Sequence, residues 1–304
     1  MTQHVVTIGT FDGVHLGHQA ILAAVAERAS VEGLPSIAYT FSLPPRALQP
    51  GAPGRVLLMP IPLKQRLLSH HVTTVVPARF IEVRDLSCER FSREILIGEL
   101  AAHTVVVGER FRFGKARAGD VQRLRALGDE FGFHVLAVPS VVLDDRPVSS
   151  TRIRNLIAKG DVETAGRLLG RPTVLQGVVV SGDRLGRKLG FPTANLEPHP
   201  RVLLPKPGIY RAHAFHPAEQ SAAVVYIGKR PTLGTDQMRC EIHLLTPPRN
   251  ELVGAPMEVH LIERLRDDRL FPTIEELKAQ IANDIETARS HGVRSPASFT
   301  PIDS

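Results

Sequence analysis

The sequence predicts two domains of different fold class: an α/β domain with a doubly wound, Rossmann-like parallel sheet, then an antiparallel β-barrel with a terminal helix. In the first half, short β-branched runs alternate with helical patterns. In the second half, β-type runs follow one another and are separated by turns rich in Gly and Pro. A chain of 304 residues is long enough for two domains, each with its own core.

The predicted strands of the first domain alternate with helices along the chain. Apolar runs predict strands over residues 5–8, 36–41, 72–76, 104–107 and 135–138. Apolar residues at helical spacing predict helices around residues 21–25 and over 63–69, 87–100 and 121–131. Ligands of such sheets bind at the carboxyl ends of the strands, so the loops that follow the strands are the first place to look for a site.

The segment between the domains carries helix stop and start signals. One helix is predicted to end at Gly160, Asp161 caps the next, and Gly170 closes that second helix. The boundary is therefore predicted after this helix. The predicted domains are residues 1–170 and 171–304.

The second domain reads as a small barrel with a helix at its end. Strands are predicted over residues 174–180, 208–215, 222–227, 241–245 and 257–265. Thr273 and Glu276 form a capping box for the final helix. The apolar stripe of this helix consists of Ile274, Leu277, Ile281, Ile285 and Ala288. The stripe predicts that the helix packs on the barrel, and residues 291–304 read as a tail.

Composition excludes several classes of protein. No apolar run approaches the roughly 20 residues of a membrane span, and the first residues lack a signal-peptide layout, so we expect a cytoplasmic protein. Cys88 and Cys240 are the only cysteines, which excludes a disulfide framework. A net charge of +6 is compatible with nucleic acid, but three Tyr, no Trp and dispersed arginines argue against it. Phosphorylated small molecules explain the positive charge equally well.

A glycine-rich loop follows the first predicted strand and leads into a helix. This order presents backbone N–H groups and a helix dipole to a phosphate group. His15 and His18 lie three residues apart where the loop becomes the helix, so both rings can face one anion. An exposed histidine pair and a pair of metal ligands are the alternatives. Asp12 is either a turn residue or a group that orients a histidine or a magnesium-bound water.

The run G-x-F-D-G-x-H-x-G-H in this loop resembles the nucleotidyltransferase signature of bacterial bifunctional riboflavin kinase/FAD synthetases. The resemblance implies that the paired histidines His15 and His18 bind ATP phosphates and take part in catalysis. It implies a wider ATP site formed by Gly9, Phe11, Asp12, Gly13, His15, Gly17 and His18. An H-x-G-H is shared with other nucleotidyltransferases, so this motif indicates a reaction class and no substrate.

A second phosphate-binding element is predicted at the start of a helix near residue 150. Ser150, Thr151 and Arg154 place hydroxyls and a guanidinium where they can bind the β- and γ-phosphates of ATP. Taken alone, the segment favours an ordinary helix cap with a solvated arginine, and the histidine motif shifts the balance to phosphate binding. It resembles the S-S-T-x-I-R motif of the same family. Two positions depart from that family: Pro44 replaces a histidine, and Arg110 replaces an Asn or Asp.

The most specific run in the chain is GDRLGRKLGFPTAN, residues 182–195. It resembles the riboflavin kinase signature G-D-x-x-G-R-x-L-G-F-P-T-A-N. The resemblance implies ATP and flavin binding by Gly182, Arg184, Gly186, Lys188, Gly190, Pro192, Thr193 and Asn195. Thr193 and Asn195 are expected to approach the magnesium ion, which prefers hard oxygen ligands. The alternative is an ordinary glycine-rich turn of the barrel.

Phosphorylation of an alcohol calls for a group that accepts the hydroxyl proton. Strand alternation puts Glu241 and His243 on one face, and the alternative is an edge-strand carboxylate in water. The segment resembles the family's E-x-H-L-L strand, which implies that Glu241 is the general base. Departures near this segment are Thr246, Val253 and Tyr226, which flank the expected flavin pocket.

The resemblance implies a bifunctional enzyme that phosphorylates riboflavin to FMN with ATP and then adenylylates FMN to FAD, both with Mg²⁺. Its partners are small molecules, with no nucleic acid or membrane, and we expect a monomer or weak homo-oligomer. One alternative is a divergent copy with one working activity or with a flavin analogue as substrate. Another is a non-catalytic flavin- or nucleotide-binding protein.

Overall fold

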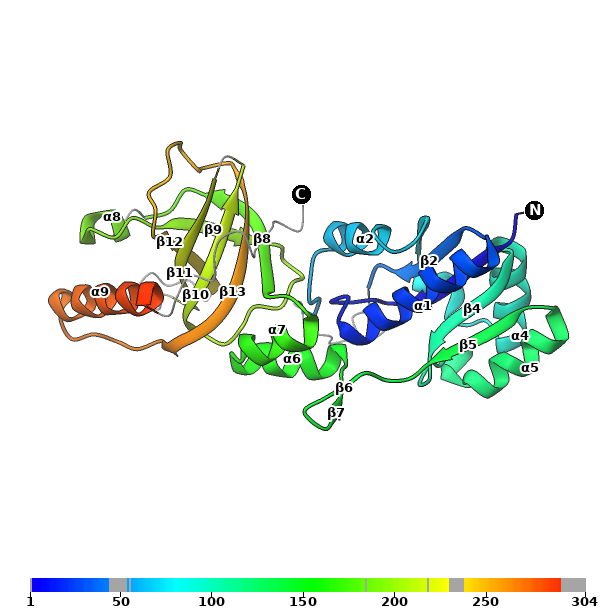
Figure 1. Cartoon of the computed structure of the whole chain (residues 1–304). Coiled ribbons are helices and arrows are strands. Elements are labelled where there is room, and N and C mark those ends of the chain that lie inside the picture. Colours follow the sequence, from blue (N-terminus) through cyan, green and yellow to red (C-terminus); the bar gives the residue numbers. More distant parts are fainter. Residues whose placement is uncertain are drawn as a thin grey trace. The chain divides into compact units, whose positions relative to one another are not determined.

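The computed structural model describes residues 2–43, 54, 56–183, 185–217, 219–229 and 238–290. The chain forms two compact units (Figure 1). The first consists of Met1–Leu57 and Ile61–Ser150, and the second of Leu58–Pro60 and Thr151–Ser304. The predicted boundary between residues 170 and 171 separates two expected activities, whereas these units are defined by compactness. The predicted boundary therefore stays a prediction.

The first unit is built on a five-stranded parallel sheet with strand order β3-β2-β1-β4-β5. Its strands are β1 (His4–Gly9), β2 (Ser36–Phe41), β3 (Thr74–Ala78), β4 (Ala102–Gly108) and β5 (His134–Val138). β1 lies at the centre, with Val6 paired to Ile37 of β2 and to Val105 of β4. The strand order reverses between β1 and β4, and ligands of open α/β sheets commonly bind at the carboxyl ends of strands at such a point.

Helices cover both faces of this sheet. They are α1 (Leu16–Glu32), α2 (Ile61–Ser69), α3 (Phe80–Val83), α4 (Cys88–Arg90), the π-helix η2 (Phe91–Glu99), the 3₁₀ turn η3 (Lys115–Arg117) and α5 (Val121–Phe131). Val6 shares a core with Leu96 of η2 and Leu124 of α5. α1 packs on β1 with Leu22 and Val25 fully buried. The doubly wound α/β prediction is therefore confirmed.

The segment predicted as a helix over residues 87–100 is helical, but it consists of two kinds of helix. Only Cys88–Arg90 is α-helical, and the chain then widens into the π-helix η2. The N–H of Leu100 donates to the carbonyl oxygen of Ile95, five residues back, at 2.9 Å. Apolar spacing alone does not distinguish the two kinds of helix, because both bury one face.

The second unit is a closed six-stranded antiparallel barrel with strand order β10-β11-β12-β9-β8-β13. Its strands are β8 (Thr173–Val180), β9 (Ala194–Pro198), β10 (Gly208–His216), β11 (Glu219–Lys229), β12 (Met238–Leu244) and β13 (Pro256–Asp267). The interior is apolar, with Leu175, Val225 and Ile242 fully buried. The barrel prediction is confirmed. β9 and the short helix α8 (Leu185–Leu189) were not predicted from the sequence.

Three further helices belong to this unit: α6 (Ser150–Lys159), α7 (Val162–Leu169) and α9 (Ile274–Ser290). Asp161 caps α7 by accepting from the N–H of Thr164 at 3.0 Å, and Gly170 ends it with a φ of 74°. Both predictions are confirmed. α7 packs on β8 and β13.

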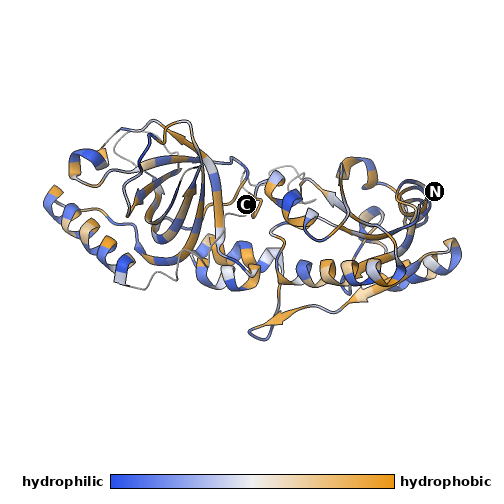
Figure 2. Cartoon of the chain, turned by 45° about the horizontal axis from the view of Figure 1, so that its top comes forward, coloured by the Kyte–Doolittle hydropathy of each residue, from blue (hydrophilic) through white to orange (hydrophobic). Residues whose placement is uncertain are grey.

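Helix α9 starts at the predicted capping box, where the Thr273 hydroxyl accepts from the N–H of Glu276 at 3.2 Å. Ile285 and Ala288 are buried against the barrel, whereas Ile274 is 58% exposed, so the predicted stripe does not include the first turn. Figure 2 shows polar and apolar residues both along this helix and along the strands of the barrel. In the described part of the chain, no helix has the length and apolar content needed to cross a membrane.

The remaining short strands, β6 (Val142–Leu143) and β7 (Arg146–Pro147), form a hairpin that the sequence did not predict.

Candidate active sites

The first candidate site is the loop between β1 and α1. His15 is the N-cap of α1, and its Nδ1 accepts from the N–H of His18 at 3.3 Å. The rings of these two histidines stack, with centroids 3.6 Å apart and planes 14° apart. His15 is only 6% exposed, which argues against an exposed pair. The structure thus brings the two predicted histidines together at a helix N-terminus, where an anion is favoured.

Two glycines make room for the aromatic rings of this loop. A Cβ at Gly9 would lie 3.1 Å from the Phe11 ring, and one at Gly17 would lie 3.2 Å from the His15 ring. The Phe11 ring in turn contacts His18 edge-on, with centroids 5.2 Å apart. Gly9 and Gly17 therefore permit the close packing that fixes both histidine rings.

The backbone of the loop is held by side chains that bind its carbonyl groups. Ser150 donates to the carbonyl oxygen of Asp12 at 2.9 Å, and Gln19 donates to that of Val14 at 2.8 Å. Phe11, Gly13 and Val14 all have positive φ values of 49°, 87° and 37°. This conformation is unfavourable for Phe and Val, so the surrounding contacts must hold it. Asp12 itself is buried.

Two other residues predicted for this site, Thr151 and the buried Arg154, lie in α6 and belong to the second compact unit. The two departures from the family pattern in this domain are Arg110 and Pro44. Arg110 is exposed after β4, with its Nε 3.9 Å from Glu109. Pro44 lies outside the described residues.

Sequence reasoning missed one residue beside this loop. Lys64 of α2 is 3% exposed, and its ammonium donates to the carbonyl oxygens of Thr10 at 3.0 Å and Phe41 at 2.6 Å. Burial lowers the pKa of Lys64 to about 8, although the nearby Asp12 carboxylate raises it. The available signal was a lysine four residues before Leu68 on the apolar face of a short helix.

The second candidate site is a cavity of about 750 Å³ in the barrel unit. Five predicted residues line it: Gly182, Gly190, Pro192, Thr193 and Asn195. Gly186 lies on α8, and a Cβ there would be 2.4 Å from the carbonyl oxygen of Phe191. Lys188 is exposed on the same helix, and Arg184 lies outside the described residues.

Strand pairing places the predicted base beside the two predicted magnesium ligands. Glu241 of β12 pairs with Asn195 of β9, and the Thr193 hydroxyl donates to Glu241 Oε2 at 3.5 Å. Glu241 is 6% exposed on a strand between two others, so the edge-strand alternative is wrong. His243 lines the cavity, and its Nδ1 lies 2.9 Å from the carbonyl oxygen of Pro192.

Some residues where the chain departs from the expected pattern line this cavity. Pro247, Pro248 and Val253 line it, together with Arg289 from the last turn of α9. Arg289 was not predicted, because its position depends on how α9 packs on the barrel. Tyr226 of β11 pairs with Glu241 on the other side of β12.

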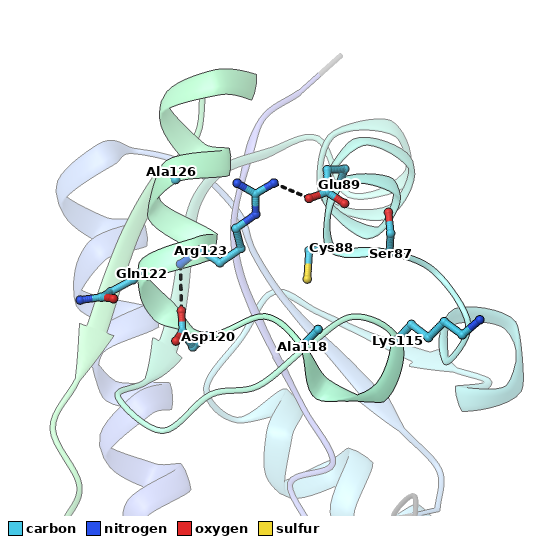
Figure 3. A pocket seen from close by; sticks show the side chains of 9 residues that line it. All are labelled: Ser87, Cys88, Glu89, Lys115, Ala118, Asp120, Gln122, Arg123 and Ala126. Atoms are coloured by element: carbon cyan, nitrogen blue, oxygen red, sulfur yellow. Dashed lines mark hydrogen bonds and ion pairs between the residues drawn. The ribbon is translucent and has the colours of Figure 1, made fainter.

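Both cysteines are buried, and neither belongs to these two sites. Burial raises the pKa of the Cys240 thiol to about 12, so this thiol is protonated at neutral pH and packs as a small apolar side chain. Cys88 lies in a separate hollow of about 670 Å³ formed by residues of α4, η3 and α5 (Figure 3). There, the Arg123 side chain forms an ion pair with Glu89, and the backbone N–H of Arg123 donates to Asp120 Oδ1 at 2.9 Å.

A Rossmann-like sheet with two stacked histidines at a helix N-terminus, joined to a barrel that carries a buried glutamate beside a threonine and an asparagine, defines a two-domain nucleotide-dependent transferase. The FAD synthetase family model matches residues 1–152, and the riboflavin kinase family model matches residues 169–291. The chain belongs to the bifunctional riboflavin kinase/FMN adenylyltransferase family.

Full-length relatives agree with this assignment. The chain is 36% identical over 298 residues to the bifunctional riboflavin kinase/FMN adenylyltransferase of Escherichia coli strain K12, covering 96% of this chain and 94% of the relative. Its identity to the Haemophilus influenzae enzyme of the same name is 35% over 287 residues, with 93% and 92% covered. A crystal structure of a protein named macrolide-efflux protein, from Streptococcus pneumoniae, has a TM-score of 0.87 at 28% identity, with 95% of each chain covered.

The chain is therefore a riboflavin kinase and FMN adenylyltransferase, which makes FMN and then FAD. Both family models match, which favours two activities over the single-activity alternative. The family is enzymatic, which argues against the nucleic-acid and non-catalytic alternatives.

Proposed function

We propose that the loop between β1 and α1 binds the phosphates of ATP and that His15 and His18 stabilise the adenylyl transfer. The observation that carries this proposal is the stacked, partly buried histidine pair at the start of α1. A phosphate oxygen of FMN attacks the α-phosphorus of ATP, the bond to the β-phosphate oxygen breaks, and pyrophosphate leaves. Positive charge and aligned N–H donors suffice for this step, without a covalent enzyme intermediate.

The wider ATP site of this domain is proposed on the family motif and the loop geometry. Its residues are Gly9, Phe11, Asp12, Gly13, Gly17, Ser150, Thr151 and Arg154. The hydrogen bond from Ser150 to Asp12 supports a link between the two motifs. The roles of Thr151 and Arg154 rest on the motif alone.

In the barrel, we propose that Glu241 accepts the proton of the riboflavin 5′-hydroxyl. That oxygen then bonds to the γ-phosphorus of ATP, the bond to the β-phosphate oxygen breaks, and ADP leaves. The hydrogen bond from Thr193 to Glu241 and the pairing of Glu241 with Asn195 support this assignment. The glycine-rich segment 182–190 is proposed to hold the nucleotide.

Magnesium is proposed to bind through the Thr193 hydroxyl and the Asn195 amide oxygen. Both are the hard oxygen donors that Mg²⁺ prefers, and this ion commonly keeps several waters and binds substrate phosphates. Within the described ranges, no cluster of three or more His, Cys, Asp or Glu side chains could hold a metal, so few protein ligands are expected. Bound Mg²⁺ neutralises phosphate charge during transfer. EDTA is expected to stop FMN formation, and full activity without a divalent cation would contradict this proposal.

Two variants with separate assays test the residue roles. Glu241→Gln is expected to lower FMN formation from riboflavin by at least about 100-fold, within the range for loss of a general base, while FAD formation from supplied FMN is retained. His18→Asn is expected to show the opposite pattern. The controls are Glu197→Gln, exposed on β9, and His134→Asn, exposed on β5. Parental FMN formation by Glu241→Gln, or parental FAD formation by His18→Asn, would refute the respective role.

A further inference from the structure

We propose that Lys64 is a positioning residue of the adenylyltransfer site. Its ammonium anchors the backbone at the start of the phosphate-binding loop. This proposal rests on the function proposed for that loop. Lys64 itself is placed away from the reacting atoms and acts through the backbone of Thr10 and the ring of Phe11.

The contacts of Lys64 join the ends of two neighbouring strands. Its ammonium donates to the carbonyl oxygen of Thr10, directly after β1, at 3.0 Å. It also donates to the carbonyl oxygen of Phe41, the last residue of β2, at 2.6 Å. Both strand ends lie at the edge of the sheet where α/β folds bind ligands. Lys64 thus fixes the point where the loop leaves the sheet.

The effect of this anchor extends to the histidine pair through consecutive contacts. The carbonyl oxygen of Thr10 also accepts from the Thr40 hydroxyl at 3.3 Å, so two donors hold this one peptide group. The next residue, Phe11, has a φ of 49°, and its ring contacts that of His18 at 5.2 Å between centroids. A change in the Thr10 peptide would therefore move the ring that sets the orientation of His18.

The chemistry of the contact favours a role in function over a role in folding alone. The buried ammonium donates to two neutral carbonyl groups, and the burial of a charged group is unfavourable. The charge of Lys64 lies next to the start of the loop that is proposed to bind a triphosphate. Asp12, the carboxylate whose charge reaches Lys64, lies in the same loop. A positive charge at this place complements the phosphate groups as well as fixing the loop.

The test uses the full-length enzyme with Lys64→Met, which removes both charge and donor, and Lys64→Gln, which keeps a donor without the charge. FAD formation from supplied FMN is expected to fall about 10- to 100-fold in Lys64→Met, mainly in kcat, because small misplacements of reacting groups have effects of this size. Lys64→Gln is expected to recover part of the loss. FMN formation by the barrel is expected to stay within about twofold of the parent.

The matched control is Arg66→Met, which removes a cation from an exposed position on the same helix. A folded Lys64→Met variant with parental kcat for FAD formation would overturn the proposal, and so would an equal loss in Arg66→Met. If Lys64→Met does not fold, a parental kcat in Lys64→Gln with KM alone changed would also overturn it. A parent chain that makes FMN but no FAD would instead refute the function proposed for the loop.

Discussion

Replacing Lys64 with methionine is expected to change how the stability of the first unit depends on pH. The amine is 3% exposed, and burial lowers its pKa from 10.5 to about 8. Because the pKa is lower in the folded state, the unfolded chain binds more protons between these two values. The free energy of unfolding of the parent therefore rises with pH across this window, and this contribution is absent in Lys64→Met.

The size of the effect follows from the shift in pKa. A difference of about 2.5 pKa units corresponds to about 3 kcal/mol of destabilisation below about pH 8, where Lys64 is charged in both states. About 1 kcal/mol of this destabilisation is left at about pH 9.5. Between about pH 7.5 and about pH 9.5, the parent should thus gain about 2 kcal/mol relative to Lys64→Met. At neutral pH, the substitution also removes two hydrogen bonds of a charged donor, about 1.5–3 kcal/mol each. Its net effect on stability is therefore the difference between the lost hydrogen bonds and the removed cost of burying the charge.

Urea unfolding read by pulse proteolysis measures this difference, because peptides of the first unit can be quantified separately from those of the barrel. A two-domain chain needs such a local probe, since one global transition does not describe it. Comparing parent with variant at each pH cancels the titration of other groups. Equal pH dependence in both proteins, within about 0.5 kcal/mol, would show that the amine is not desolvated and would refute the reasoning.

Two further predictions concern the barrel. Gly182→Ala is expected to lower FMN formation at least about tenfold without changing FAD formation from supplied FMN, because its Cβ would lie 2.1 Å from Asn195 Nδ2 and displace a site residue; parental FMN formation would contradict this. Arg266→Gln is expected to lower the free energy of unfolding of the barrel by about 3–5 kcal/mol, because Arg266 makes hydrogen bonds of 2.7–3.1 Å to the buried Asp284 of α9. Urea unfolding measures this loss, the exposed Arg269→Gln is the control, and equal effects of the two substitutions would refute it.

Elements with strong local signals were predictable from the sequence. The bounds of β2 and α5 agree with those expected, because each apolar run has clear ends. Asp120 caps α5 by accepting from the N–H of Arg123 at 2.9 Å, and Gly132 ends that helix with a φ of 82°. Such signals lie within a few residues of each other, so they are visible without knowledge of the fold.

The elements that were missed depend on partners far along the chain. β9 lies in a segment rich in Gly and Pro, and it becomes a strand because β8 and β12 pair with it on either side. Lys64 reads as an ordinary surface lysine until α2 is placed against the ends of β1 and β2. Sequence patterns record which residues are apolar, but they do not record which distant backbone a buried ammonium will contact.

Some of the departures from the family pattern in the barrel line its cavity. Pro247, Pro248 and Val253 line the cavity, whereas Thr193 and Glu241 keep the expected identities and contact each other. Residues that line a binding cavity away from the reacting atoms affect which molecule fits. Residues beside the transferred phosphoryl group affect the reaction itself. With Thr193 and Glu241 acting as proposed, the divergent residues Pro247, Pro248 and Val253 are expected to alter flavin selection while phosphoryl transfer is retained, because changes in uniform binding act on KM rather than kcat.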